Sequence, residues 1–156
     1  MGAAMNRFNS LRRPTLALVA VVGLGFARPA GADDSLPFRG RADAVITGAV
    51  STPDGLLLTT SGTGRATHLG QFTREERILV GADGTFVGQV TFTAANGDRL
   101  DALIDGAFTS PTTAVATYTF AGGTGRFADA TGSAAVAAVT PDGLHIALAF
   151  EGSIAF

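Results

Sequence analysis

Apolar and polar residues alternate along short stretches of this chain, which is the pattern of a β-strand with one buried face. In the final stretch, one face carries Leu144, Ile146, Leu148, Phe150, Ile154 and Phe156, whereas His145, Glu151 and Ser153 lie on the other. Helix-type spacing is nearly absent, and glycine clusters separate the stretches. The pattern predicts strands over residues 39–50, 55–61, 63–69, 71–80, 85–94, 99–109, 112–121, 132–140 and 144–155.

Four short turn sequences between these stretches predict β-hairpins. The tetrapeptide Thr-Pro-Asp-Gly stands at 52–55 and again at 140–143. Its proline presets φ, and its glycine accepts a positive φ. Ala82-Asp83-Gly84 and Asn96-Gly97-Asp98 follow the same logic. Because hairpins join antiparallel neighbours, the chain is predicted to run as an up-and-down meander.

The expected fold class is all-β, a single antiparallel eight-stranded β-barrel. The count of eight follows if residues 55–61 and 63–69 form one strand that bends at Gly62 and Gly64. The last strand is so apolar that it would promote aggregation as a free edge, so we expect it to pair within a closed sheet. A lipocalin-like barrel and a β-sandwich are the alternatives.

Residues 1–32 are predicted to be a cleavable signal peptide that precedes a barrel domain at 33–156. Arg7, Arg12 and Arg13 form a positive n-region, and an apolar run of about 12 residues follows. That run is shorter than the ~20 residues a transmembrane helix needs. Ala30-Gly31-Ala32 matches a signal-peptidase site. We therefore expect export to the periplasm or the medium and no integral membrane segment in the mature chain, with the Sec and twin-arginine routes both open.

Charge and composition exclude several classes of function. Without residues 1–32 the chain keeps seven arginines and thirteen acidic residues, a net charge of −6, and it has no lysine. Such a chain is a poor ligand for nucleic acid. With no cysteine, thiol catalysis and cysteine-ligated zinc are excluded. No G-x-S-x-G elbow occurs, and the Gly-Thr-Gly loops do not continue as phosphate loops. No cofactor is expected.

The segment Gly122-Gly123-Thr124-Gly125-Arg126-Phe127-Ala128-Asp129-Ala130-Thr131-Gly132 resembles the G-G-T-G-x-F-x-x-A-x-G segment of dirigent proteins and allene oxide cyclases. The resemblance implies their eight-stranded antiparallel barrel, with a glycine turn and a short helical corner between two late strands. In that setting Gly123, Gly125 and Gly132 are structural and Phe127 plugs a barrel end. Residues 62–73, together with 92–98, also look like secreted bacterial barrel proteins of unknown function. No catalytic residue is carried over.

The quartet Arg74-Glu75-Glu76-Arg77 offers the most informative polar residues. Alternation places Arg74 and Glu76 on one face with Phe72 and Ile78, so this pair is the one we expect to point inward. A buried charge pair costs desolvation and is a candidate for binding a polar ligand or for acid–base work. The alternative is that the strand projects beyond its neighbours and that water surrounds both pairs.

Two further residues complete the candidate ligand-binding set. His68 precedes a glycine at a strand end, where it either caps a turn carbonyl or reaches a pocket. Tyr118 lies among Val115, Thr117 and Phe120 and belongs either to the core or to a pocket. His145 is expected on the exposed face. Because the two histidines lack the spacing of known metal motifs, no metal site is predicted.

Three classes of function remain open from the sequence. We favour a secreted barrel that binds a small apolar or amphipathic molecule in its lumen, which eight strands can just accommodate. The enzymatic alternative is a cofactor-free cyclase or isomerase in which Arg74, Glu76 or His68 polarises the substrate. The third is a structural or surface protein with a filled lumen. The sequence leaves the oligomeric state open.

Overall fold

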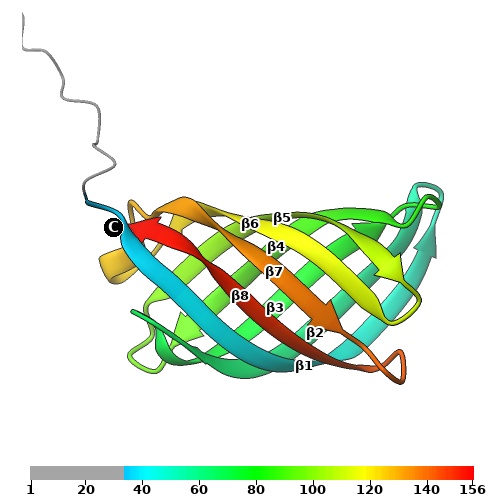
Figure 1. The fold of residues 1–156 in the computed structure, drawn as a ribbon, viewed down its shortest axis with the longest axis horizontal. Coiled ribbons are helices and arrows are strands. Elements are labelled where there is room, and N and C mark those ends of the chain that lie inside the picture. Colours follow the sequence, from blue (N-terminus) through cyan, green and yellow to red (C-terminus); the bar gives the residue numbers. More distant parts are fainter. Residues whose placement is uncertain (1–33) are drawn as a thin grey trace, which may run out of the picture. The chain divides into compact units, whose positions relative to one another are not determined.

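The chain forms a closed antiparallel barrel of eight strands, as seen in a computed structural model that describes residues 34–156 (Figure 1). The predicted signal peptide, residues 1–32, lies outside the described residues. Each strand pairs with its neighbour in the chain, and β8 pairs with β1 to close the sheet. The strands are β1 (Leu36–Thr52), β2 (Gly55–Ala66), β3 (Gly70–Val80), β4 (Thr85–Ala94), β5 (Arg99–Ser110), β6 (Thr113–Gly123), β7 (Thr131–Val139) and β8 (His145–Ala155). This confirms the predicted barrel, including the single strand over 55–66, and excludes the β-sandwich.

The connections alternate between the two ends of the barrel. The four predicted hairpin turns all form, and their glycines adopt positive φ. We call one end the cavity end; it holds the β1–β2, β3–β4, β5–β6 and β7–β8 turns. The other, the plugged end, holds the β2–β3, β4–β5 and β6–β7 connections together with Leu36 and Phe156. In Figure 1 the cavity end lies at the right and the plugged end at the left.

The inward face of each strand follows the alternation in the sequence. Near the plugged end, an aromatic cluster fills the lumen. The Phe38 ring lies 4.9 Å from that of Phe120 and 5.4 Å from that of Phe150, and the Phe92 ring lies 5.6 Å from that of Tyr118. All of these side chains are buried. The plugged half of the barrel is therefore a packed core, and any internal space lies towards the cavity end.

The glycine-rich segment before β7 forms the corner that seals the plugged end. Gly125 takes a φ of 59° and begins the one-turn 3-10 helix η2 (Gly125–Phe127). Phe127 is fully buried, and its ring lies 5.1 Å from that of Phe156. A Cβ on Gly123 would stand 1.9 Å from the carbonyl oxygen of Arg99, so only glycine allows β5 and β6 to approach there. The glycine turn and the buried phenylalanine thus lie where the resemblance places them.

No helix within residues 34–156 is long and apolar enough to cross a membrane.

Candidate functional site

The predicted inward pair lies at the middle of β3, inside the barrel. Arg74 is 1% exposed and Glu76 is 10% exposed, and Arg74 Nη2 forms an ion pair with Glu76 Oε2. Strand β3 is paired on both sides at this level, with Arg74 opposite Gly62 of β2 and Phe92 of β4. The alternative of a strand that projects into water is therefore wrong. The ligand-binding role of the two residues remains a prediction.

Small residues lie beside Arg74 on the β2 side of its strand. In the barrel register, Arg74 pairs with Gly62, and Gly62 pairs with Ala44 of β1. A longer side chain at Gly62 has no space, because a Cβ there would stand 2.2 Å from the carbonyl oxygen of Asp43. Towards β1 and β2 the row that contains Arg74 therefore carries small residues, whereas Phe92 lies beside Arg74 on β4.

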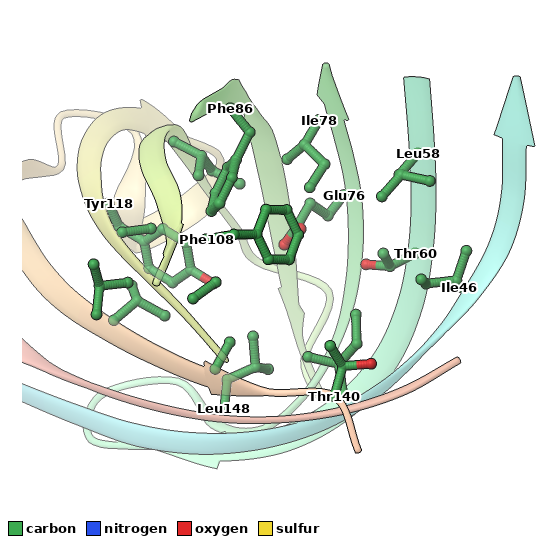
Figure 2. A pocket seen from close by; sticks show the side chains of 17 residues that line it. Ile46, Leu58, Thr60, Glu76, Ile78, Phe86, Phe108, Tyr118, Thr140 and Leu148 are labelled. Carbon is green, nitrogen blue, oxygen red and sulfur yellow. The ribbon is translucent and has the colours of Figure 1, made fainter. Parts of the chain in front are cut away.

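A mainly apolar cavity of about 80 Å³ lies between this ion pair and the cavity end of the barrel (Figure 2). All eight strands or the turns beside them contribute to its wall. The apolar lining includes Ile46, Leu58, Ile78, Phe86, Ile104, Phe108, Ala114, Val136, Ala138, Ile146 and Leu148, and the polar lining consists of Thr60, Glu76, Tyr118 and Thr140. The cavity is thus an apolar space with a few polar groups, which is typical of small-molecule sites.

The hydroxyl group of Thr60 is the second polar group deep in this cavity. Thr60 is 3% exposed, and its Oγ1 has no hydrogen-bond partner among the described residues. Figure 2 shows this oxygen directed into the cavity, on the side that faces Glu76. Thr60 and Glu76 are direct cross-strand partners in β2 and β3. A buried hydroxyl without a partner is destabilising, and Thr60 Oγ1 is free to form a hydrogen bond with a molecule in the cavity.

Arg74 also retains an unpaired donor. Its Nε is buried and has no hydrogen-bond partner in the part of the chain that the structure describes. Thr140 Oγ1, beside the β7–β8 turn, is likewise buried without one. The unpaired polar atoms of the interior therefore lie beside the cavity or at its rim.

Tyr118 belongs to both the core and the cavity. Its side chain is 1% exposed, and its ring packs 5.9 Å from that of Phe150 while also forming part of the cavity wall. The two alternatives that the sequence left open for this residue are therefore both correct.

His68 is not brought to this site. It lies in the β2–β3 connection at the plugged end, with a φ of 65°, and its Nε2 is 3.1 Å from the carbonyl oxygen of Pro37. Its ring also packs 5.5 Å from that of Phe156. The structure thus favours the turn-capping alternative and places His68 at the opposite end from the cavity. Connections alternate between the ends, so a residue in the β2–β3 turn cannot join the cavity end.

The other histidine and the remaining acidic groups lie on the surface. His145 is exposed, as expected, and its Nδ1 hydrogen bonds Asp142 Oδ2 at 2.6 Å. This bond, with those from the backbone N–H groups of His145 and Leu144, holds the pKa of Asp142 far below its usual range. Asp101 and Asp105 lie on the outward face of β5. Among residues 34–156, no three His, Asp or Glu side chains gather as metal ligands would.

Sequence reasoning missed Thr60, Thr140 and Phe108 as cavity residues. Thr60 shares the even-numbered inward positions of its strand with Leu58, so strand alternation could have placed it. Alternation from Leu100 and Ile104 puts Phe108 on the inward face of its strand, yet it stands at the cavity end, 37% exposed, with its ring 5.4 Å from that of Phe86. A register shift between Phe108 and Ser110 interrupts the alternation there.

Comparisons with known proteins agree with this architecture. No family model matches the chain, and no curated protein matches it in sequence. Among solved structures, the chain is similar to the pterocarpan synthase dirigent protein GePTS1, with a TM-score of 0.54. The match covers 78% of this chain and 90% of that protein at 15% sequence identity. At this identity the likeness concerns the fold alone, and the chain has a dirigent-like, closed antiparallel eight-stranded β-barrel.

Proposed function

We propose that this protein binds a small, mainly apolar molecule in the cavity at one end of its barrel. The observation that carries the proposal is an apolar cavity whose wall includes Glu76, the carboxylate of the buried ion pair, and an unpartnered hydroxyl group, Thr60 Oγ1. Dirigent-like barrels are compatible with such a role, because an eight-stranded barrel can hold one small ligand.

The competing class is a structural barrel with a filled lumen. Such a protein has no use for a buried Arg74–Glu76 pair, because well-packed apolar residues in its place are often as stable or more so. The lumen of this chain is filled only in its plugged half, by the aromatic cluster around Phe92. A cavity remains in the other half, where the polar groups lie, and this arrangement favours binding.

Size limits what can enter the cavity. Its volume of about 80 Å³ is well below the ~300–1,000 Å³ that is usual for drug-sized ligands. Either a narrow ligand inserts one end, or a side chain at the rim moves aside. Phe108 is the candidate for such movement, because it is the most exposed large side chain of the wall that Figure 2 labels.

A cavity-filling variant tests the proposal. Ala138 lines the cavity, whereas its neighbour Ala137 is exposed on the outer wall of the same strand, β7. We expect Ala138→Leu to abolish stabilisation by small apolar compounds in thermal-shift assays, and Ala137→Leu to leave it unchanged. Native mass spectrometry of protein purified from its producing cells or their medium then identifies any ligand that co-purifies. A wild-type protein that gains no stability from any compound in the panel contradicts the proposal.

A second function is supported by the position of Glu76, whose carboxylate reaches the cavity. A cofactor-free isomerase or cyclase needs a polar group inside an apolar enclosure, and Glu76 supplies one. The test is to incubate excess co-purified ligand with the protein and to follow its conversion by chromatography. Conversion by the wild type but not by Glu76→Gln supports catalysis, whereas an unchanged ligand leaves binding as the function.

We also propose that the barrel acts outside the cytoplasm. The support is the arginine-flanked apolar segment and the Ala30-Gly31-Ala32 site before the described residues. Amino-terminal sequencing of the protein from its source tests this, with Asp33 as the expected first residue. An intact amino terminus in cytoplasmic protein would contradict it.

A further inference from the structure

The inner end of the cavity carries a charge pair that is already balanced. Arg74 cannot lose its proton in a protein, so the carboxylate of Glu76 must be ionised to neutralise it. The pair is almost completely buried, and apolar side chains form most of the remaining wall. A third charge in this space would have no counter-ion and would lose its hydration. The cavity therefore disfavours both anionic and cationic ligands.

The hydrogen-bonding groups at the inner end can bind a ligand group that both donates and accepts a hydrogen bond. An ionised carboxylate only accepts hydrogen bonds, whereas a threonine hydroxyl donates one and accepts others. Thr60 Oγ1 has no partner among the described residues, and Thr60 stands directly across the β2–β3 ladder from Glu76. Side chains so paired lie within about 4.5–5.5 Å at their Cβ atoms. A single ligand hydroxyl group can donate to Glu76 and accept from Thr60.

The volume of the cavity selects among hydroxyl compounds. At about 80 Å³ it is smaller than the ~150 Å³ apolar cavity that holds a benzene ring in an engineered protein. An aliphatic chain is narrower than an aromatic ring, so it can insert one end into this space while the rest of the chain extends beyond it. Glu76 and Thr60 lie at the inner end, whereas Thr140 lies at the rim, so a hydroxyl group that contacts both Glu76 and Thr60 would lead and the chain would extend towards Phe108 and the rim.

We propose that the cavity selects an uncharged aliphatic alcohol, inserted hydroxyl-first, and discriminates against carboxylates and amines of the same chain length. This inference rests on the proposed binding function and names its ligand class. Glu76 and Thr60 form hydrogen bonds with the hydroxyl group, and the apolar wall contacts the alkyl chain. Arg74 keeps the Glu76 carboxylate ionised, so that it acts only as an acceptor.

A series of six-carbon ligands tests the selectivity. Isothermal titration calorimetry of the purified protein at neutral pH compares 1-hexanol, hexane, hexanoate and hexylamine. We expect 1-hexanol to bind at least about tenfold more tightly than hexane, since a hydrogen bond to a charged group contributes that much, and both ions to bind more weakly than 1-hexanol. Equal binding of 1-hexanol and hexane, or tightest binding of hexanoate, overturns the inference alone. Absence of binding by all four contradicts the proposed function as well.

Variants of Thr60 and Glu76 test whether these two residues cause the preference for 1-hexanol. Thr60→Val keeps the side-chain shape and is expected to reduce the preference for 1-hexanol over hexane by about threefold to tenfold. Glu76→Gln leaves Arg74 without a counter-ion, so the preference should shift towards hexanoate. Glu75→Gln, on the exposed face of the same strand, is the matched control and should change nothing. An unaltered ligand preference in both Thr60→Val and Glu76→Gln overturns the assignment.

A double variant keeps the test decisive if Glu76→Gln does not fold. Arg74→Met/Glu76→Leu replaces the ion pair by apolar residues of similar length, which buried sites often tolerate. We expect it to bind hexane like the wild type and to lose the preference for 1-hexanol. If the ratio of the affinities for 1-hexanol and hexane is the same in the double variant as in the wild type, the ion pair does not bind the hydroxyl group.

Discussion

At the scale of single residues, the balance between Arg74 and Glu76 decides what the barrel interior tolerates. The two charges neutralise each other, and the attraction between them offsets the free energy that each loses when it is removed from water. A buried pair of this kind contributes little net stability compared with apolar residues, but removal of one partner leaves an uncompensated charge. The proposed specificity for an uncharged ligand follows from that balance.

Stability measurements can separate these effects. Glu76→Gln should destabilise the protein by about 3–5 kcal/mol, because Arg74 is left buried and unpaired, whereas Arg74→Met/Glu76→Leu should be close to neutral. Urea unfolding at neutral pH measures both. Glu75→Gln on the exposed face is the control and should stay within about 0.5 kcal/mol of the wild type. If Glu76→Gln and Arg74→Met/Glu76→Leu were equally stable, the Arg74–Glu76 pair would not be buried as described.

Phe108 should control the size of ligand that the cavity admits. It is partly exposed at the rim, so Phe108→Ala is expected to cost about 1–2 kcal/mol, less than the 3–5 kcal/mol of a fully buried phenylalanine. The variant should gain thermal stabilisation from toluene, which the wild-type cavity is too small to hold. Val87→Ala, on the outer wall, should gain none. A toluene response equal to that of the wild type would show that Phe108 does not limit entry.

At the scale of elements, the hairpin turns hold neighbouring strands in register. The β7–β8 turn contains a carboxylate whose effect on stability can be measured as a function of pH. In the β7–β8 turn, Asp142 accepts hydrogen bonds from the His145 side chain and from two backbone N–H groups, and these lower its pKa from the ordinary 3.8. A depressed folded-state pKa stabilises the protein above the unfolded value, and this stabilisation is lost as the pH falls below it.

The acid limb of the stability curve should therefore depend on Asp142. Because about half of the Asp142 side chain is exposed to solvent, the contribution is small. We expect wild-type stability to fall more steeply than that of Asp142→Asn as the pH is lowered below about 4. Chemical unfolding at a series of pH values measures the difference. Asp54→Asn, in the same tetrapeptide at the β1–β2 turn, is the matched control, and parallel curves for wild type and Asp142→Asn would contradict the expectation.

The glycine corner before β7 gives a second test at this scale. A Cβ on Gly123 would collide with the backbone oxygen of Arg99, whereas a Cβ on Gly70 would meet nothing within 4 Å and pays only for its φ of 67°. Gly70→Ala should therefore cost about 1–2 kcal/mol, and Gly123→Ala distinctly more. Thermal unfolding of both variants decides. If the two variants lose equal stability, contact between β5 and β6 does not require a glycine at 123.

Strand alternation explains why so much of the barrel could be predicted from the sequence. The period of two placed Arg74 and Glu76 inside, and the turn sequences fixed the hairpins, because both depend on neighbouring residues only. The prediction failed where the structure depends on packing across the barrel. His68 was considered for the pocket although it lies at the opposite end, and Thr60 went unnoticed because a single threonine within an apolar stripe is common. The irregular register at Phe108 carried no sequence signal.

At the scale of the whole molecule, closure of the sheet by β1 and β8 holds the two halves of the lumen in place. Leu36 pairs with Ile154 near the plugged end and Val45 pairs with His145 near the cavity end, so the ladder between the first and last strands runs along the barrel (Figure 1). The plugged end supplies a rigid core, and the cavity end carries the candidate site. Binding at one end does not require rearrangement of the other.

Because the core and the candidate site lie at opposite ends of the barrel, we expect a circular permutation at the plugged end to leave the site intact. A short flexible linker should be able to join Asp34 to Phe156, and new termini can open between Asn96 and Gly97, in an exposed hairpin turn at the plugged end. Every strand pair of the barrel is kept, so we expect the permuted protein to fold and to bind the same ligands as the wild type, measured by circular dichroism and calorimetry. Deletion of residues 145–156 should instead leave β1 and β7 as free edges and cause aggregation. A permuted protein that folds but binds nothing would place the ligand at the plugged end, and would contradict the site at the cavity end.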